Sequence, residues 1–259
     1  MSDLVDVTVR GTVGVLTLND PARRNVLSAS MVAKIGAALD DLESQPALSA
    51  VVVTGAGASF CAGAELDTLS RAIGGDFSLI RGVYSSFTRF TSSPLLTIAA
   101  VDGPAVGAGL NLALACDIRI VAETARLVPR FTELRIFPGG GHTWLLARAI
   151  GQQATTLAVL QGRSWEGGAA VEAGLAAQCV PPEQLLAAAV SVAEVTREME
   201  PEYVRRLVQV LRSVPRLPDY ARAVEIEAAH QHWSISRPAF RAGLTQLQDR
   251  LRSAKAARR

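Results

Sequence analysis

Two segments of the chain repeat one pattern: a short apolar run, a turn of tiny residues, and a second apolar stretch. They are VVVTGAGASFCAGAEL (residues 51–66) and AAVDGPAVGAGLNLALACD (residues 99–117). An uninterrupted apolar run bounded by a turn is typical of a strand buried on both faces. Successive strand–turn–helix units place their strands parallel to one another. We therefore predict an α/β fold with a parallel sheet.

The rest of the chain is consistent with this prediction. Residues 5–18 alternate on either side of Gly11, which indicates a β-hairpin. Helices are expected over residues 28–42 and 79–90, and strands over residues 95–101, 117–121 and 126–128. From residue 182 onward only helices are expected. We therefore divide the chain into a core of residues 1–198 and a helical region of residues 199–259.

Composition excludes several classes of protein. The 259 residues are 49% apolar and 19% charged, which suffices for one large core and excludes general disorder. The net charge is only +2 and the basic residues form no stripe in the sequence, so we expect no nucleic-acid partner. Three scattered cysteines (Cys61, Cys116 and Cys179) support neither a disulfide framework nor a metal site. The start of the chain lacks a signal peptide, and no apolar run could span a membrane, so we expect a cytoplasmic protein without membrane partners.

The two turns could serve the same chemical function. Tiny residues allow a backbone to approach a ligand, and the first amides of a helix have no partner within that helix. Two such helix starts that converge would bind a developing oxyanion. The alternative is that small residues only permit tight packing of helix against strand. Neither turn has the glycine pattern of a dinucleotide site or a P-loop.

Both turns, together with NDPARRNVLS, FPGGGHTWLLARAIG and LQGRSWEGGAAVEAGLAAQCV, resemble the signature blocks of the crotonase (enoyl-CoA hydratase/isomerase) superfamily. The likeness covers essentially the whole chain. It implies a crotonase-like spiral of repeated ββα units with a C-terminal helical oligomerisation region. It also implies an acyl-CoA thioester as substrate, as in fatty acid metabolism, with no further cofactor. The expected assembly is a homotrimer, or a homohexamer built as a dimer of trimers.

The resemblance assigns roles to matching positions. The oxyanion donors fall on the amides of Ala64 and Ala108, with Gly109 beside the second. The segments that border the CoA moiety fall on Arg23, Arg24, Val26, Ala62 and Leu66. An arginine at position 23 or 24 suits a phosphate because its guanidinium binds oxygens in a bidentate manner.

Two departures from the family pattern bear on the reaction. The family's hydratases place glutamates at the positions of Asn111 and Phe131, where neither residue can transfer a proton. The loss of a positioned acid or base costs about 10²–10⁴-fold in rate. We therefore expect an isomerase-type or atypical activity instead of efficient hydration.

Other groups are candidates for the missing acid or base. Glu133 is the first candidate, since an isomerase needs one base, although a solvated surface glutamate is an equally good interpretation. His142 is the second, and its simpler role is that of a residue in the first turn of a helix. Some isomerases of the family place an acid directly after the proline of the FPGGGHTWLLARAIG block, where this chain has Gly139. The alternative function is a catalytically silent acyl-CoA binding or shuttle protein, and a scaffold without a ligand is a third. The acyl group is not indicated, although residues 71–81 are expected to line its pocket.

Overall fold

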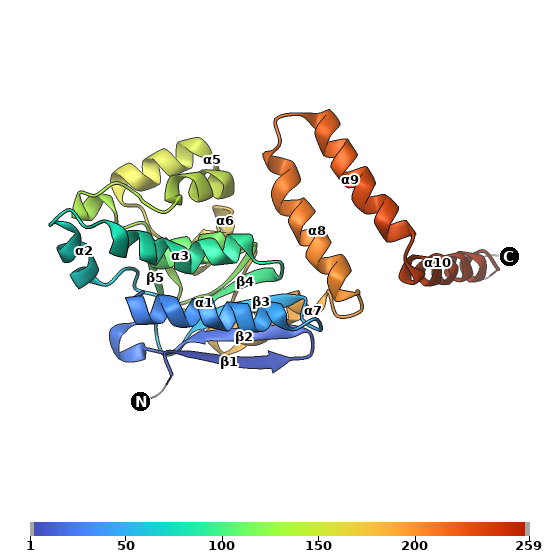
Figure 1. Cartoon of the computed structure of the whole chain (residues 1–259), viewed down its shortest axis with the longest axis horizontal. Coiled ribbons are helices and arrows are strands. Elements are labelled where there is room, and N and C mark those ends of the chain that lie inside the picture. The colour runs from blue at the N-terminus through green and yellow to red at the C-terminus, as the bar shows by residue number, and fades with distance from the viewer. Residues whose placement is uncertain (1–2, 257–259) are drawn as a thin grey trace. The chain divides into compact units, whose positions relative to one another are not determined.

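The computed structural model describes residues 3–256, with side chains through residue 253. Its contacts divide the chain into two units, Met1–Arg197 and Glu198–Arg259. The first unit contains every strand found among the described residues, and the second consists of helices (Figure 1). None of the helices in the described part of the chain is both long and apolar enough to cross a membrane.

A six-stranded sheet forms the centre of the first unit, with the order β1-β2-β3-β4-β6-β9. The predicted hairpin is present, with β1 (Val5–Arg10) antiparallel to β2 (Val13–Leu18). From β2 onward every pairing is parallel, as predicted. The parallel strands after β2 are β3 (Ala50–Gly55), β4 (Leu96–Val101), β6 (Ile118–Ala122) and β9 (Gln178–Val180).

The first unit also contains a smaller, three-stranded sheet in the order β5-β7-β8. Its strands are β5 (Pro104–Val106), β7 (Arg126–Val128) and β8 (Trp165–Glu166). The sequence predicts residues 103–109 as a turn only, whereas three of them form β5. A three-residue strand is too short to give a periodic signal, and its hydrogen bonds come from β7, which lies far along the chain.

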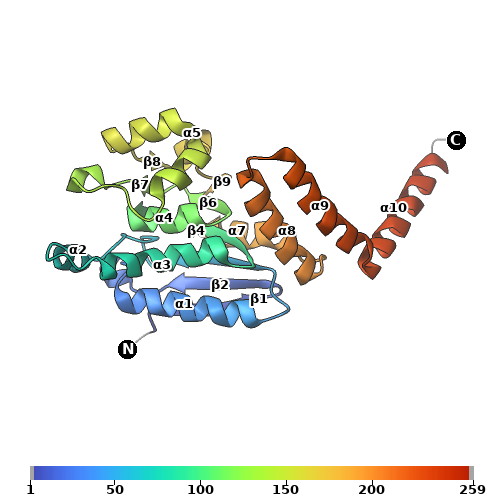
Figure 2. The same cartoon turned by 45° about the horizontal axis from the view of Figure 1, so that its top comes forward.

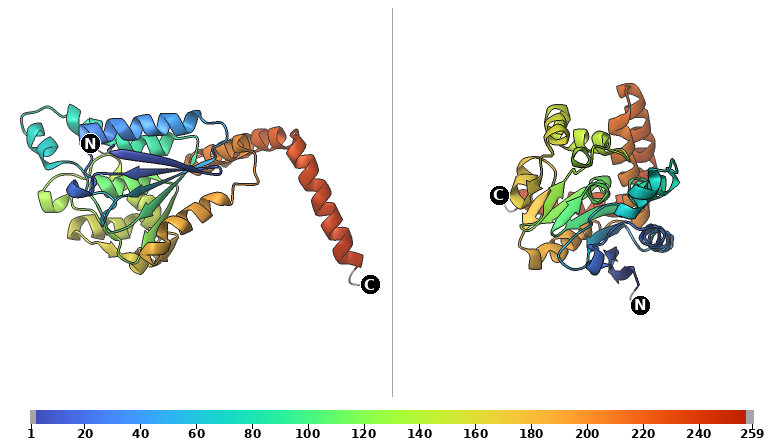
Figure 3. Two further views of the ribbon diagram at one scale, coloured as in Figure 1. Left: turned by 90° about the horizontal axis from the view of Figure 1, so that it is seen from below. Right: turned by 90° about the vertical axis from the view of Figure 1, so that its left-hand side faces the viewer.

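Helices cover both faces of the large sheet (Figure 3). On one face α1 (Ala29–Ser44) and α3 (Ser78–Ser92) lie side by side. The Oγ of Ser28 accepts from the amide of Met31 and caps α1. On the other face α7 (Leu185–Glu194) packs its apolar side chains against the β-branched residues of the strands.

The helix α4 (Ala108–Ala115) lies between α3 and α5 (His142–Gln161), as Figure 2 shows. Its residues from Gly109 to Ala115 are buried, so its first turn is fixed in place by core packing. The shorter helices are η1 (Pro21–Arg23), α2 (Leu66–Ala72), η2 (Thr132–Leu134), α6 (Gly167–Glu172) and η3 (Pro182–Gln184).

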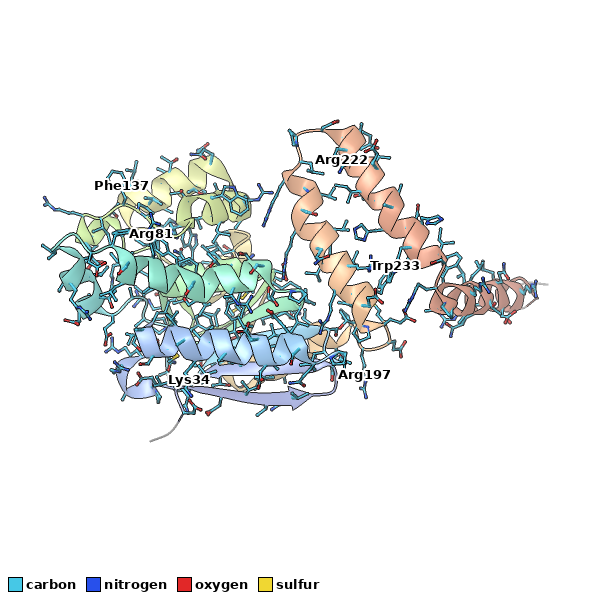
Figure 4. All side chains as sticks on the ribbon, viewed as in Figure 1. Lys34, Arg81, Phe137, Arg197, Arg222 and Trp233 are labelled. Atoms are coloured by element: carbon cyan, nitrogen blue, oxygen red, sulfur yellow. The ribbon has the colours of Figure 1, made fainter. Side chains whose placement is uncertain are left out.

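The second unit begins with α8 (Pro201–Ser213), where Pro201 occupies the first helical turn. The segments that follow are η4 (Val214–Arg216), α9 (Tyr220–Ile235) and α10 (Pro238–Ala256). Trp233 of α9, labelled in Figure 4, carries the guanidinium of Arg206 4.2 Å and that of Arg237 5.3 Å from its ring centroid. These cation–π contacts join α8 to α9 and hold Arg237, the residue before α10, on the same ring.

Candidate active site

The two glycine-rich turns meet in the first unit. The amide of Cys61 donates to the carbonyl of Pro104 at 3.1 Å, and the amide of Val106 donates to the carbonyl of Cys61 at 3.0 Å. A Cβ on Gly63 would lie 2.5 Å from Val106 O and 3.4 Å from Ala108 N. A Cβ on Gly109 would collide with the carbonyl of Cys61. Glycine is therefore required at both positions for the turns to approach this closely.

Ala64 and Ala108 lie at this junction, and neither amide donates to an acceptor among the described residues. Ala108 is the first residue of α4, after Gly107 with φ 53°, so its amide points out of the helix start. Ala64 is held beside Leu27, whose amide donates to Gly63 O at 2.8 Å. Two free backbone donors at one rigid junction are the chemical requirement of an oxyanion site.

Asn111 follows Ala108 by one helical turn and is buried. Its Nδ2 donates to the carbonyl of Gly139 at 3.0 Å. Its Oδ1 lies 2.7 Å from Nδ1 of His142. Asn111 thus connects α4 to the glycine turn that precedes α5.

His142 is fully buried at the first position of α5. Burial lowers the pKa of its imidazole from 6.5 to about 4, so the ring is neutral at pH 7. The ring of Phe131 packs against it, with 4.7 Å between centroids. The three residues Asn111, Phe131 and His142 therefore form one cluster, which includes both positions that the resemblance aligns with the glutamates of hydratases.

Glu133 lies in a different environment from this cluster. Its side chain is 68% exposed in η2, and its carboxylate is 2.9 Å from Nε of Arg130. An exposed ion pair of this kind is worth little energy, but it satisfies the carboxylate at the surface. The structure does not bring Glu133 into the buried cluster.

The two arginines that the resemblance assigns to CoA differ in their contacts. Arg23 is paired with Asp20 at 2.7 Å and with Glu65 at 2.9 Å. Arg24 is exposed, has φ 56°, and forms no ion pair among residues 3–256. Its carbonyl accepts from the amide of Ala62 at 2.9 Å, which fixes this loop against the first glycine turn. Of the two, Arg24 has the guanidinium available for a phosphate.

The apolar members of the CoA set are partly or largely accessible. Val26 and Ala62 are half-buried, whereas Leu66 at the start of α2 is 69% exposed. Asp67 and Arg71 follow Leu66 on the same short helix. These residues line the surface beside the junction of the turns.

Asn25 is a structural residue of the site that the sequence analysis missed. It is fully buried with φ 56°, and its Nδ2 donates to Ser59 O at 2.7 Å and to Ala56 O at 3.0 Å. Its Oδ1 accepts from the amide of Asp20 at 2.8 Å. Asn25 therefore fixes the arginine loop to the first glycine turn. Its tolerance of the left-handed region was the one available signal in the sequence.

Tyr84 of α3 was also missed. A Cβ on Gly139 would collide with the Tyr84 hydroxyl, and a Cβ on Gly140 would collide with the ring of Phe87. The aromatic side chains of α3 thus occupy the space in which a residue larger than glycine would extend. The Tyr84 hydroxyl has no hydrogen-bond partner among the described residues. No signal in the sequence connected Tyr84 with a turn more than fifty residues away.

Other chemistry has less support at this site. Burial raises the pKa of the Cys61 thiol to about 12, so this residue is not a thiolate at neutral pH. Among the described residues there is no group of three histidine, cysteine, aspartate or glutamate side chains that could hold a metal ion.

Comparison with known proteins identifies the family and the fold. Residues 8–254 match the enoyl-CoA hydratase/isomerase family. A probable enoyl-CoA hydratase of Mycobacterium tuberculosis is 39% identical over 255 residues, which are 96% of this chain and 98% of that protein. The crystal structure of an enoyl-CoA hydratase from Bacillus anthracis has a TM-score of 0.87 at 28% identity, covering 95% of this chain and 96% of that one.

A Thermobifida fusca protein solved in complex with acetoacetyl-CoA has a TM-score of 0.80 at 26% identity, covering 90% of this chain and 95% of that one. The predicted crotonase-type fold is thus confirmed. The chain belongs to the enoyl-CoA hydratase/isomerase family.

Proposed function

We propose that this protein is an acyl-CoA enzyme that stabilises a thioester enolate with the backbone amides of Ala64 and Ala108. The observation that carries the proposal is the junction of the two glycine-rich turns, where both amides lack an acceptor. Each preorganised donor of this kind contributes about 3 kcal/mol to a transition state. The Thermobifida fusca relative in complex with acetoacetyl-CoA supports a CoA thioester as the ligand class.

The CoA moiety binds along the arginine loop and the start of α2. Arg24 pairs with a phosphate, while Val26, Ala62 and Leu66 contact the rest of the carrier. Arg23, which is already paired with Asp20 and Glu65, holds the loop in shape. The substrate brings its own activating group, the thioester, so the reaction requires no further cofactor.

The reaction is a proton shift within the acyl chain, not the addition of water. A carboxamide at position 111 and a phenyl ring at position 131 cannot activate water or protonate carbon. Phe131 instead packs its ring on His142, the residue whose Nδ1 faces Asn111. An isomerase requires one group that removes a proton and returns it, and the enolate oxygen is held at the amides meanwhile.

The alternative is a catalytically silent acyl-CoA binding protein. The surface ion pair of Glu133 with Arg130 favours it, because the first candidate base does not reach the buried cluster. Calorimetric binding of crotonyl-CoA, 3-hexenoyl-CoA and free CoA, combined with turnover assays, separates the possibilities. Binding with isomerisation supports the enzyme, and binding without turnover of any acyl-CoA supports the silent protein. Thioesters that bind no better than free CoA contradict both and leave a scaffold.

The protein functions as a homotrimer or as a dimer of trimers. This part of the proposal rests on the resemblance and on exposed apolar side chains of the second unit, including Leu207, Leu211, Leu244 and Leu247. Burial of such side chains between subunits would stabilise the assembly.

A further inference from the structure

His142 contains a polar atom that the fold leaves unsatisfied. Its Nε2 is buried and has no hydrogen-bond partner among residues 3–256. A buried acceptor without a partner loses its hydration and gains nothing in return. Such an atom in a folded protein calls for an explanation, and a ligand that supplies the missing partner is one.

The hydrogen bonds of Asn111 determine the protonation of this ring. The carbonyl of Gly139 can only accept, so the amide nitrogen of Asn111 must face it and the amide oxygen must face His142. Nδ1 of His142 is therefore the donor to Asn111 Oδ1. In a neutral imidazole with Nδ1 protonated, Nε2 carries a lone pair. Asn111 thus fixes the tautomer that presents Nε2 as a base.

The groups around the imidazole are neutral. They are Asn111 from α4, Gly139 from the turn and Phe131 from the segment before η2. On α3, Tyr84 and Phe87 pack against the same turn. The charged residues that flank Phe131 in the sequence, Arg130 and Glu133, pair with each other at the surface. Among residues 3–256, the hydrogen-bond and ring-packing partners of the imidazole include no carboxylate that would hold a proton on it, so the imidazole is available as a proton acceptor at pH 7.

We infer that His142 is the catalytic base of this site, with Nε2 as the atom that accepts the substrate proton and Asn111 as its positioning residue. This inference rests on the proposed function and names the group that the proposal leaves open. Phe131 is half-buried over the imidazole, so an acyl chain reaches Nε2 by displacing this ring.

The step balances with a 3-enoyl thioester. Nε2 takes a proton from C2, and the electron pair of that C–H bond forms a dienolate whose oxygen accepts from the amides of Ala64 and Ala108. The imidazolium then returns the same proton to C4, while the double bond moves from C3–C4 to C2–C3. The products are a 2-enoyl thioester and the neutral imidazole, and no other reactant is consumed.

Two substitutions distinguish a catalytic role of His142 from a purely structural one, in which its hydrogen bond to Asn111 only holds α4 and α5 together. His142→Asn keeps a nitrogen donor near the position of Nδ1 for Asn111 but removes Nε2. His142→Gln places an amide near the position of Nε2 but removes the donor to Asn111. We expect kcat for 3-hexenoyl-CoA isomerisation to fall about 10²–10⁴-fold in both variants, with binding of acetoacetyl-CoA changed less than about threefold. His232→Asn, an exposed histidine in the second unit, is the matched control and should behave as wild type.

A spectroscopic readout tests the tautomer independently of turnover. In protein with ¹⁵N-labelled histidine at pH 7, we expect Nδ1 of His142 protonated and Nε2 unprotonated. The Nε2 resonance should shift when acetoacetyl-CoA binds and should not shift with free CoA. A ring protonated on Nε2 instead would contradict the inference.

Failure of the inference can be distinguished from failure of the proposed function. If wild-type protein binds no acyl-CoA, the proposed function itself is wrong. If it isomerises 3-hexenoyl-CoA and His142→Asn retains that activity, the role of His142 is purely structural and the inference is overturned. If it binds acyl-CoA but neither isomerises it nor incorporates deuterium from D₂O at C2, the inference is also overturned and the silent protein remains.

Discussion

His142 has a consequence for stability that is separate from catalysis. Its pKa is about 4 in the folded chain and about 6.5 in an unfolded one, so the unfolded state binds more protons between these values. The contribution of His142 to the free energy of unfolding should therefore be fully present above pH 6.5 and should decrease as the pH falls toward 4. The expected loss from this group is about 3 kcal/mol. Urea unfolding of wild type and His142→Asn at pH 7.5 and pH 4.5 measures it. The difference between the two proteins should shrink at the lower pH, and a constant difference would contradict the assignment.

Asn25 provides a second test at the scale of one residue. Asn25→Ala removes its side-chain hydrogen bonds and leaves the carbonyl of Ser59 without this donor. It also places alanine at φ 56°. We expect a loss of about 3 kcal/mol in unfolding free energy. Asn25→Gly loses the same bonds without the backbone strain, so it should be about 1 kcal/mol less destabilised than the alanine variant. Equal losses in chemical denaturation would show that the left-handed conformation carries no cost.

At the scale of helices and strands, the sequence predicted the elements that depend on the residues within one segment. The apolar run at residues 95–101 and the periodic segment at residues 28–42 form β4 and α1, with small shifts of their ends. The strand β5 was missed because its pairing with β7 is a tertiary contact. The same reason explains the site: the Asn111–His142 hydrogen bond joins residues 31 apart, and no local pattern indicates it.

The resemblance added the amides of Ala64 and Ala108, which composition and periodicity alone left open. It also identified Asn111 and Phe131 as departures. It did not indicate that His142 fills the same buried cluster, because its environment depends on how α5 packs on α4. Glu133 was ranked first because its position in the sequence is close to the lost glutamate. Its side chain instead lies at the surface beside Arg130.

The close approach of α4 to the first glycine turn can be tested by adding one methyl group. Gly109→Ala places a Cβ against the carbonyl of Cys61, which belongs to the backbone and cannot move without displacing the turn. We expect acetoacetyl-CoA binding to weaken at least tenfold, since the two amides no longer meet in the same geometry. Calorimetry measures the affinity, and circular dichroism verifies that the variant is folded.

Gly36→Ala is the control for this substitution. Gly36 lies within α1, and a Cβ there meets nothing within 4 Å. Alanine in a helix is favoured over glycine by about 1 kcal/mol, so this variant should be slightly more stable with unchanged binding. If Gly109→Ala binds acyl-CoA as tightly as Gly36→Ala does, the junction of the turns is not the ligand site.

On the scale of the whole molecule, apolar side chains without cover remain on both units. The first unit exposes Leu134, Ile136 and Phe137, the last of which is 95% exposed and labelled in Figure 4. In the second unit, α10 exposes an apolar stripe at helical spacing. The stripe consists of Phe240, Leu244, Leu247 and Leu251. A stripe of this kind on a helix indicates a surface that packs against a partner.

We expect sedimentation equilibrium to give a trimer or a hexamer for the wild-type protein. The double substitution Leu244→Glu with Leu251→Glu places two charges in the stripe, where burial between subunits would leave them unpaired, so it should dissociate the assembly. Ala242→Glu with Gln246→Glu adds the same charge on the opposite side of α10 and should leave the mass unchanged. If both double variants sediment like wild type, the stripe is not part of a subunit interface. If wild type is a monomer at micromolar concentration, self-association itself is wrong, while the proposed enolate site in the first unit is judged by its own tests.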